Sequence, residues 1–209
     1  MKKSLKELEI KHGGIHRGIS KSGKEHQGGD RCCTNGYDAV YELFFPMIKN
    51  PKVIVEIGTF TGTGLRVLSD YFPNARIIGL DISPETVEDP GRAEVHFFDQ
   101  RDPKRLDKIL NGDKIDIVID DGLHRMFSMV NTYDYFREYL NDNSLYFIED
   151  LSPQGRVNNP IEELINNCTV YQPKHGKGRI AVITNPFNAG ITEAGKKFVE
   201  KYKNQGELK

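Results

Sequence analysis

Short apolar runs recur along most of the chain, and each ends in a group of polar residues. The runs are KVIVEIG (52–58), ARIIGLDIS (75–83), AEVHFFDQ (93–100), KIDIVIDDG (114–122) and SLYFIEDL (144–151). Their length and their content of β-branched and aromatic residues are typical of strands buried on both faces of a parallel sheet. The pattern therefore predicts five central β-strands.

Amphipathic segments separate these runs and predict helices over residues 65–71, 103–110 and 126–140. Another helix is expected over residues 37–49, where Pro46 marks a kink or an end. Strands that alternate with helices in this order predict an α/β protein with a Rossmann-like, doubly wound sheet.

The last part of the chain predicts a different arrangement. A short helix is expected near residues 161–166, and the runs CTVYQP (168–173) and RIAVITN (179–185) flank the segment KHGKG. Two runs joined by such a turn predict a hairpin. The sheet is therefore expected to be mostly parallel, with one antiparallel edge strand.

The first residues lack this pattern. Residues 11–36 are rich in Gly, Lys, His and Ser and show no apolar periodicity. We expect an irregular N-terminal arm over residues 1–36 and one packed domain over residues 37–209. A solvated basic tail without a role in function remains the alternative for the arm.

Composition narrows the classes of function. The chain has 209 residues, and its 29 basic and 30 acidic side chains leave a net charge of −1, so no overall field would hold it on nucleic acid or on an anionic membrane. Three cysteines are too few for a disulfide framework, and no run reaches the roughly 18 apolar residues of a membrane span. We therefore expect a cytoplasmic protein with a small-molecule partner, and leave a homo-oligomer open.

Acidic residues stand at the carboxyl ends of all five predicted central strands. They are Glu56, Asp81, Asp99, the pair Asp120 and Asp121, and the pair Glu149 and Asp150. Ligands of open α/β sheets bind at this edge. Because a fold alone does not require an acid at every strand end, the sequence favours one shared polar site.

A glycine-rich turn follows the first strand, with Gly58, Gly62 and Gly64 spaced G-x-x-x-G-x-G. This spacing differs from the dinucleotide G-x-G-x-x-G and lacks the Gly-Lys-Ser/Thr of a P-loop. Asp81, at the end of the second strand, could accept hydrogen bonds from a ribose diol. Tight packing between strand and helix is the alternative explanation for the glycines.

Together these residues resemble the class I S-adenosylmethionine-dependent methyltransferases over about residues 51–150. The resemblance implies the class I methyltransferase fold, with S-adenosylmethionine as cofactor, Asp81 on the ribose, and Asp99 with Gln100 beside the adenine. The full set expected at the cofactor site is Tyr37, Glu56, Gly58, Thr59, Gly62, Gly64, Asp81, Ile82, Asp99, Gln100 and Asp120.

The fourth and fifth strands should bring Asp121, Glu149 and Asp150 together. Such a cluster of like charges is costly without a cation, and its oxygen ligands favour Mg²⁺, with Mn²⁺ or Ca²⁺ as alternatives. His124 follows Asp121 closely and could take a proton from a hydroxyl beside the metal. A histidine that caps or packs against the next helix is the alternative.

The motifs Asp-Asp-Gly-x-His and Ile-Glu-Asp resemble those of the metal-dependent sugar O-methyltransferases of the macrocin and mycinamicin type and their cephalosporin hydroxylase-like relatives. The resemblance implies that Asp121, Glu149 and Asp150 bind Mg²⁺, that His124 is the general base, and that the acceptor is a sugar or vicinal diol. Upstream, Arg31 stands where this family usually has Lys, and Asn35 stands where His is common.

Two other classes of function stay open on the sequence. One is a hydroxylase or an NAD-dependent enzyme on the same fold, although the loop spacing disfavours NAD. The other is a non-catalytic protein that binds S-adenosylmethionine or serves assembly. The acceptor itself is not identified by the sequence, although residues 151–160 are expected to form part of its binding wall.

Overall fold

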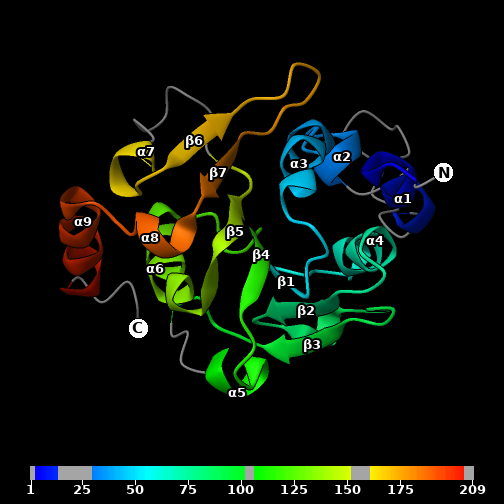
Figure 1. Cartoon of the computed structure of the whole chain (residues 1–209), viewed down its shortest axis with the longest axis horizontal. Coiled ribbons are helices and arrows are strands. Elements are labelled where there is room, and N and C mark those ends of the chain that lie inside the picture. The colour runs from blue at the N-terminus through cyan, green and yellow to red at the C-terminus, as the bar shows by residue number, and fades with distance from the viewer. Residues whose placement is uncertain (1–2, 14–29, 102–105, 152–160, 205–209) are drawn as a thin grey trace.

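A seven-stranded sheet forms the centre of the molecule in the computed structural model, which describes residues 3–13, 30–101, 106–151 and 161–204 (Figure 1). The strand order is β3-β2-β1-β4-β5-β7-β6. The strands are β1 (Val53–Ile57), β2 (Arg76–Asp81), β3 (Glu94–Phe97), β4 (Ile115–Asp120), β5 (Leu140–Ile148), β6 (Cys168–Tyr171) and β7 (Ile180–Thr184). The five predicted central strands are confirmed.

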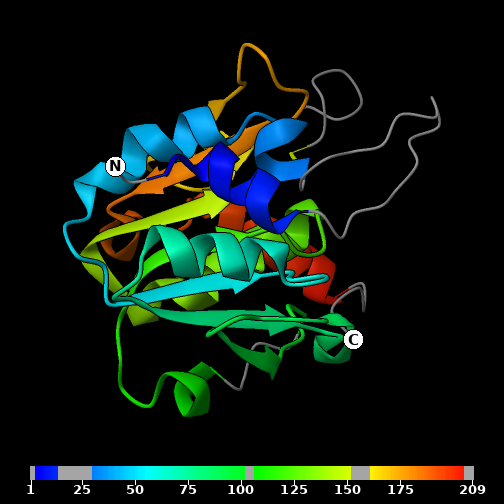
Figure 2. The ribbon, with the colours of Figure 1, turned by 90° about the vertical axis from the view of Figure 1, so that its right-hand side faces the viewer.

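The five strands from β3 to β5 are parallel, whereas β7 runs antiparallel to β5 and to β6 (Figure 2). The predicted hairpin is therefore present, with its antiparallel strand second from the edge. Ile57 pairs with Leu80 and with Asp120, and Asp120 pairs with Ile148. This register places the carboxyl ends of β2, β1, β4 and β5 side by side.

Helices cover both faces of the sheet (Figures 1 and 2). One face carries α1 (Leu5–His12), α2 (Asp30–Cys33), α3 (Asp38–Phe44) and α4 (Thr63–Tyr71). The other carries α5 (Leu106–Leu110), α6 (Met126–Phe136), α7 (Ile161–Leu164), α8 (Pro186–Ala189) and α9 (Glu193–Asn204). Short 3₁₀ turns are η1 (Phe45–Met47), η2 (Pro84–Thr86) and η3 (Arg137–Tyr139).

Alternation along each strand divides the core into two layers. On β1, Val53, Val55 and Ile57 face one hydrophobic cluster, whereas Ile54 faces the other. Glu56 lies between Val55 and Ile57 and is also buried. Because successive strand residues point to opposite faces, Glu56 projects toward the layer of α1 to α4, where a charged partner must be found for it.

The prediction of an irregular N-terminal arm is wrong for α1 and α2. Ser4 and Glu7 form a reciprocal capping box at the start of α1, and Leu5 and Leu8 are buried in the core. A helix this short needs only two apolar residues on one side to pack, so it leaves little periodicity in the sequence. Residues 14–29, also assigned to the arm, lie outside the described residues.

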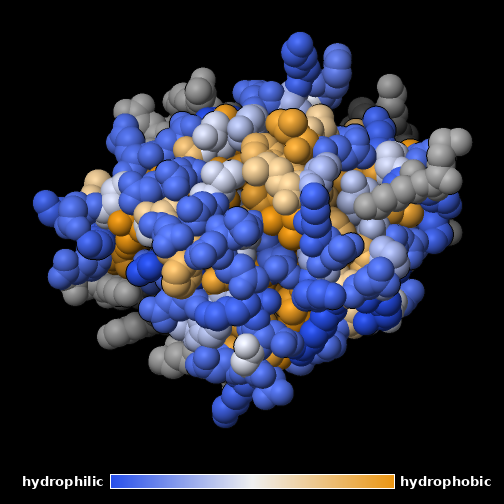
Figure 3. Space-filling model, viewed as in Figure 1, coloured by the Kyte–Doolittle hydropathy of each residue, from blue (hydrophilic) through white to orange (hydrophobic). Residues whose placement is uncertain are grey.

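Polar and charged side chains cover most of the face seen in Figure 3, and an apolar area lies near its upper centre. Leu43 and Met47 are exposed apolar residues on α3 and η1. Within the described ranges, no helix is both long enough and apolar enough to cross a membrane.

Candidate functional site

A cavity of about 580 Å³ opens at the carboxyl ends of the parallel strands. Its described lining includes eight of the predicted site residues, which are Gly58, Asp81, Ile82, Asp99, Gln100, Asp121, His124 and Asp150. Several other lining residues are not among the predicted ones, including Asp30, Phe60 and Leu123. The strand ends therefore meet at one cavity, as the rule for open α/β sheets requires.

Backbone amides fix the carboxylate of Asp81. Oδ2 accepts hydrogen bonds from the N–H groups of Thr59 (2.7 Å) and Phe60 (3.2 Å), and Oδ1 accepts one from Ser83 N–H (2.9 Å). A carboxylate held in this way keeps lone pairs for further donors. Asp81 can thus receive two hydroxyl groups of a ligand at the cavity wall.

Apolar side chains form part of the cavity beside Asp81. Phe60, Ile82 and Leu123 line it and are 56%, 51% and 45% exposed. Large apolar groups left open in a cavity are suited to cover a flat, weakly polar ligand. Next to them, hydrogen bonding to Arg101 holds the pKa of Asp99 below its ordinary value, so Asp99 is an anion at this wall.

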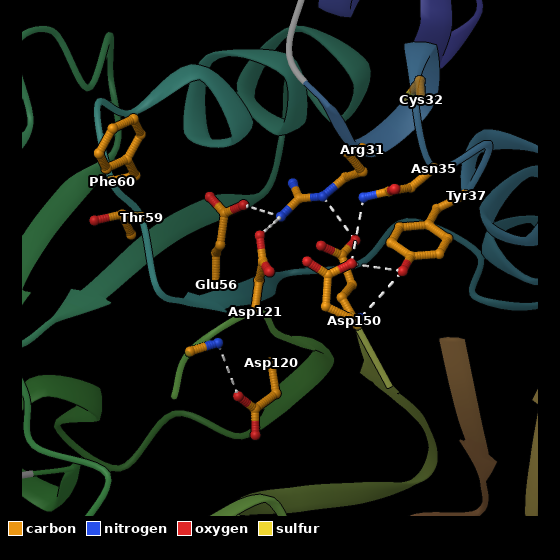
Figure 4. Close-up of polar contacts among 12 residues, drawn as sticks. Arg31, Cys32, Asn35, Tyr37, Glu56, Thr59, Phe60, Asp120, Asp121 and Asp150 are labelled. Atoms are coloured by element: carbon orange, nitrogen blue, oxygen red, sulfur yellow. Dashed lines mark hydrogen bonds and ion pairs between the residues drawn. The ribbon is translucent and has the colours of Figure 1, made fainter. Parts of the chain in front are cut away.

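Arg31 of α2 joins three buried or half-buried carboxylates, one within β1 and two directly after β4 and β5 (Figure 4). Its Nη2 lies 2.6 Å from Glu56 Oε1 and 3.3 Å from Asp121 Oδ2. Its Nε lies 2.7 Å from Glu149 Oε1. Burial acts to lower the pKa of Arg31, but Glu149 and Glu56 outweigh it and hold the pKa well above its ordinary value.

Tyr37, at the start of α3, and Tyr41, within it, complete the cluster. Tyr41 OH donates a hydrogen bond to Glu149 Oε1, and Tyr37 OH donates one to Asp150 Oδ1 at 2.7 Å. Asn35 Nδ2 also donates to Asp150 Oδ1, at 3.3 Å. Burial raises the pKa of Glu149, whereas Arg31 and Tyr41 oppose the rise. The glutamate is thus a buried acid that depends on its partners for charge stabilisation.

Asp121, His124 and Asp150 come together on the cavity wall. One potential ligand atom from each of these residues lies within 4.8 Å of the other two. His124 Nε2 is 3.7 Å from Asp121 Oδ1. Glu149 is only 1% exposed and lies behind this group. The carboxylate oxygens of Asp121 and Asp150 suit a divalent cation such as Mg²⁺, and the imidazole of His124 lies beside them.

A buried amide holds the loop that carries His124. Gln100 Nε2 donates to Asp120 Oδ1 at 2.7 Å, and Gln100 Oε1 accepts from Leu123 N–H at 2.7 Å. Tyr146 OH donates to the second oxygen of Asp120. Burial raises the pKa of Asp120 to about 7. These contacts join the amide that follows β3 to the acid that ends β4, and together they fix the turn between Asp121 and His124.

The glycines of the turn after β1 make room for other parts of the protein. A Cβ on Gly58, whose φ is +81°, would lie 2.1 Å from the carbonyl oxygen of Asp121. A Cβ on Gly64 would lie 2.1 Å from Glu56 Oε1 and 2.6 Å from Arg31 Nη1. Both glycines are therefore required by contacts within the site itself.

Not all predicted cofactor residues reach the cavity. Six of the predicted residues are not among the described residues that line the cavity: Tyr37, Glu56, Thr59, Gly62, Gly64 and Asp120. Glu56 and Tyr37 instead hold Arg31 and Asp150, and Thr59 holds Asp81. Asp120 faces Gln100 and Tyr146, so its predicted contact with the cofactor finds no support in this geometry. The segment predicted as the acceptor wall lies outside the described residues beyond Leu151.

Comparison with protein families matches residues 48–205 to a family described as a methyltransferase domain. The chain is 32% identical over 133 residues to 8-demethyl-8-alpha-L-rhamnosyl tetracenomycin-C 2'-O-methyltransferase of Streptomyces olivaceus, which covers 59% of this chain and 35% of that protein. It is also 32% identical over 120 residues to mycinamicin VI 2''-O-methyltransferase of Micromonospora griseorubida, and this match covers 53% of this chain and 30% of that protein. The chain thus spans about a third of the length of these relatives.

A solved structure has a similar fold. The MycE methyltransferase from the mycinamycin biosynthetic pathway, solved in complex with Mg and SAH, superposes with a TM-score of 0.63 at 21% sequence identity. The match covers 93% of this chain and 57% of the other.

Proposed function

Because the chain belongs to the methyltransferase-domain family, we propose that it transfers a methyl group from S-adenosylmethionine to a hydroxyl group of a small acceptor. The acceptor is a sugar or glycoside with neighbouring hydroxyl groups. One observation carries the proposal: Asp121, His124 and Asp150 meet on the same cavity as Asp81. Both relatives are named O-methyltransferases, and the name of one specifies a rhamnosyl compound, which supports the choice of acceptor.

The cavity wall formed by β1 and β2 would hold the cofactor. Asp81 accepts the ribose hydroxyls, and Phe60, Ile82 and Leu123 cover the adenine. Gly58 lets the chain pass close to Asp121, which brings the cofactor wall against the carboxylates. S-adenosylmethionine supplies the methyl group on a positively charged sulfur. The protein then has to align donor and acceptor and exclude water.

Asp121, Glu149 and Asp150 are the proposed metal ligands. Asp121 and Asp150 present carboxylate oxygens on the cavity wall. Glu149 is buried, and its Oε1 forms an ion pair with Arg31 and accepts a hydrogen bond from Tyr41, so Oε2 is the oxygen that it would offer. Oxygen donors of this kind suit Mg²⁺. When bound, the ion would act as a Lewis acid that makes an acceptor hydroxyl more acidic.

His124 is the proposed general base. Its side chain is partly exposed on the cavity wall, and its Nε2 lies near Asp121, which can orient the ring. The imidazole takes the proton from the acceptor hydroxyl as the oxygen attacks the methyl carbon. The proton ends on His124, the new bond joins oxygen to carbon, and the bond from carbon to sulfur breaks.

A transfer assay tests the proposal. S-adenosylmethionine with a labelled methyl group is incubated with the protein and a panel of free sugars, nucleotide sugars and glycosides, with Mg²⁺ or with EDTA. We expect label on an acceptor with neighbouring hydroxyls, and loss of transfer in EDTA. Asp81→Asn should weaken S-adenosylhomocysteine binding in calorimetry, whereas the exposed control Asp113→Asn should not. If the protein bound NAD and did not bind S-adenosylhomocysteine, the proposal would be overturned.

A further inference from the structure

The structure assigns a positioning role to Glu9, a carboxylate of α1. We propose that Glu9 fixes α2, so that Arg31 holds the carboxylate cluster in the arrangement that binds a divalent cation. The inference rests on the proposed metal-assisted function and extends it to a residue far from the cavity.

Glu9 is only 3% exposed, and its carboxylate binds the backbone of α2. Cys32 N–H donates to both of its oxygens, at 2.9 and 3.1 Å, and Cys33 N–H donates to Oε2 at 2.8 Å. A buried carboxylate lowers stability unless it is hydrogen-bonded, so Glu9 favours the position of α2 in which these N–H groups reach it. The attachment point lies immediately after Arg31 in the chain.

The helix that carries Glu9 is itself firmly attached to α4. Leu5 and Leu8 are buried in the core between these elements. Asp70 of α4 accepts hydrogen bonds from Lys11 Nζ at 2.6 Å and His12 Nε2 at 2.8 Å. Arg66 of α4 donates to the carbonyl oxygen of His12 at 3.1 Å. Through these contacts α1 offers a fixed support, and Glu9 transmits its position to α2.

A displaced α2 would change the cluster directly, because the Arg31 guanidinium contacts Glu56, Asp121 and Glu149 at once. Two effects compete when Arg31 moves away. The cluster becomes more negative, which favours a cation, but Asp121 and Glu149 lose the donor that orients their oxygens. Removing outer partners of metal ligands typically weakens metal binding about 10- to 100-fold, so we expect the loss of orientation to prevail.

Calorimetric titration with Mg²⁺, alone and with S-adenosylhomocysteine, tests the role. Glu9→Ala should weaken Mg²⁺ binding about 10-fold, and Glu9→Gln less, because its amide oxygen retains one acceptor. Arg31→Ala should weaken it at least as much, and the double variant should be no weaker than Arg31→Ala alone, since both changes act through Arg31. Glu200→Ala, on the exposed side of α9, is the matched control and should bind as the native protein does.

The Cys32 thiol provides a second measurement. Cys32 is buried, so in a Cys33→Ser, Cys168→Ser background a thiol reagent should label it slowly. Glu9→Ala should accelerate labelling if α2 is released. If the two changes weakened Mg²⁺ binding additively in the double variant, or if folded Glu9→Ala bound Mg²⁺ with native affinity, the role of Glu9 would be overturned and the proposed metal site would stand. Failure of the native chain to bind Mg²⁺ would overturn the proposed metal site as well.

Discussion

Three residues other than glycine that line the cavity have a left-handed backbone. They are Phe60, His124 and Asp150, with φ of +43°, +51° and +51°. For a residue with a side chain this conformation costs about 1–3 kcal/mol and persists only where the surroundings enforce it. At His124 the enforcing contacts are those of Gln100 with Leu123 and Asp120. The strain is therefore located where a side chain must be aimed into the cavity.

At this scale the first prediction concerns His124. His124→Asn should lower the rate of methyl transfer about 10²- to 10⁴-fold, because the general base is lost, and should leave S-adenosylhomocysteine affinity nearly unchanged. The rate is measured with the acceptor found in the transfer assay, and the affinity by calorimetry. His96→Asn, on β3 and outside the described cavity lining, is the control. A rate within a few-fold of the native one would exclude His124 as the base.

Helix α4 shows how an element adapts to the charged cluster. Its second residue, Gly64, lies where Glu56 and Arg31 form their ion pair, with no space for a Cβ. Glycine inside a helix usually lowers stability by about 0.5–1 kcal/mol relative to alanine. Here that cost allows the buried ion pair to lie against the start of the helix.

Gly64→Ala should therefore destabilise the protein, against the usual trend for helices. We expect a loss of about 1–3 kcal/mol in the free energy of unfolding, measured by urea denaturation, because Glu56 and Arg31 must move. Gly112→Ala is the control: its Cβ would meet no atom within 4 Å, so it tests only the cost of a positive φ. A Gly64→Ala protein more stable than the native one would contradict the geometry.

Periodicity predicted the long elements well and the short ones poorly. The five parallel strands and α4 follow from apolar runs and amphipathic spacing. The helix predicted over residues 126–140 is instead divided into α6 and η3. Strand β5 begins at Leu140, before the apolar run that predicted it. Helices α1 and α2 depend on Leu5 and Glu9, whose partners are distant in sequence and leave no periodic signal.

Charge is distributed unevenly over the whole molecule. The net charge is −1, yet acids from four strand ends line one cavity. Burial raises the pKa of Asp121, and the neighbouring Glu149 raises it further. Asp81, Asp121 and Asp150 could be predicted from their places at strand ends. The role of Arg31 could not, because its position depends on tertiary contacts between α1 and α2.

Ligand binding should consequently stabilise the whole fold. At 100 times its dissociation constant, S-adenosylhomocysteine should add about 2.7 kcal/mol to the free energy of unfolding, and Mg²⁺ at the same relative excess should add about as much again. Thermal unfolding with and without S-adenosylhomocysteine measures the first contribution, and unfolding with and without EDTA measures the second. Asp121→Asn should keep the first and lose the second. If EDTA lowered the unfolding temperature of the native protein and of Asp121→Asn equally, the assigned metal site would be contradicted.

The cluster around Arg31 joins parts of the chain that are made at very different times. Arg31 meets Asp121 across 90 residues, Tyr41 meets Glu149 across 108, and Tyr37 meets Asp150 across 113. During synthesis on the ribosome, the cationic and phenolic partners emerge long before the last two acids. Loop closure over such distances delays these contacts. The site should thus be among the last regions to acquire its native structure as the chain folds.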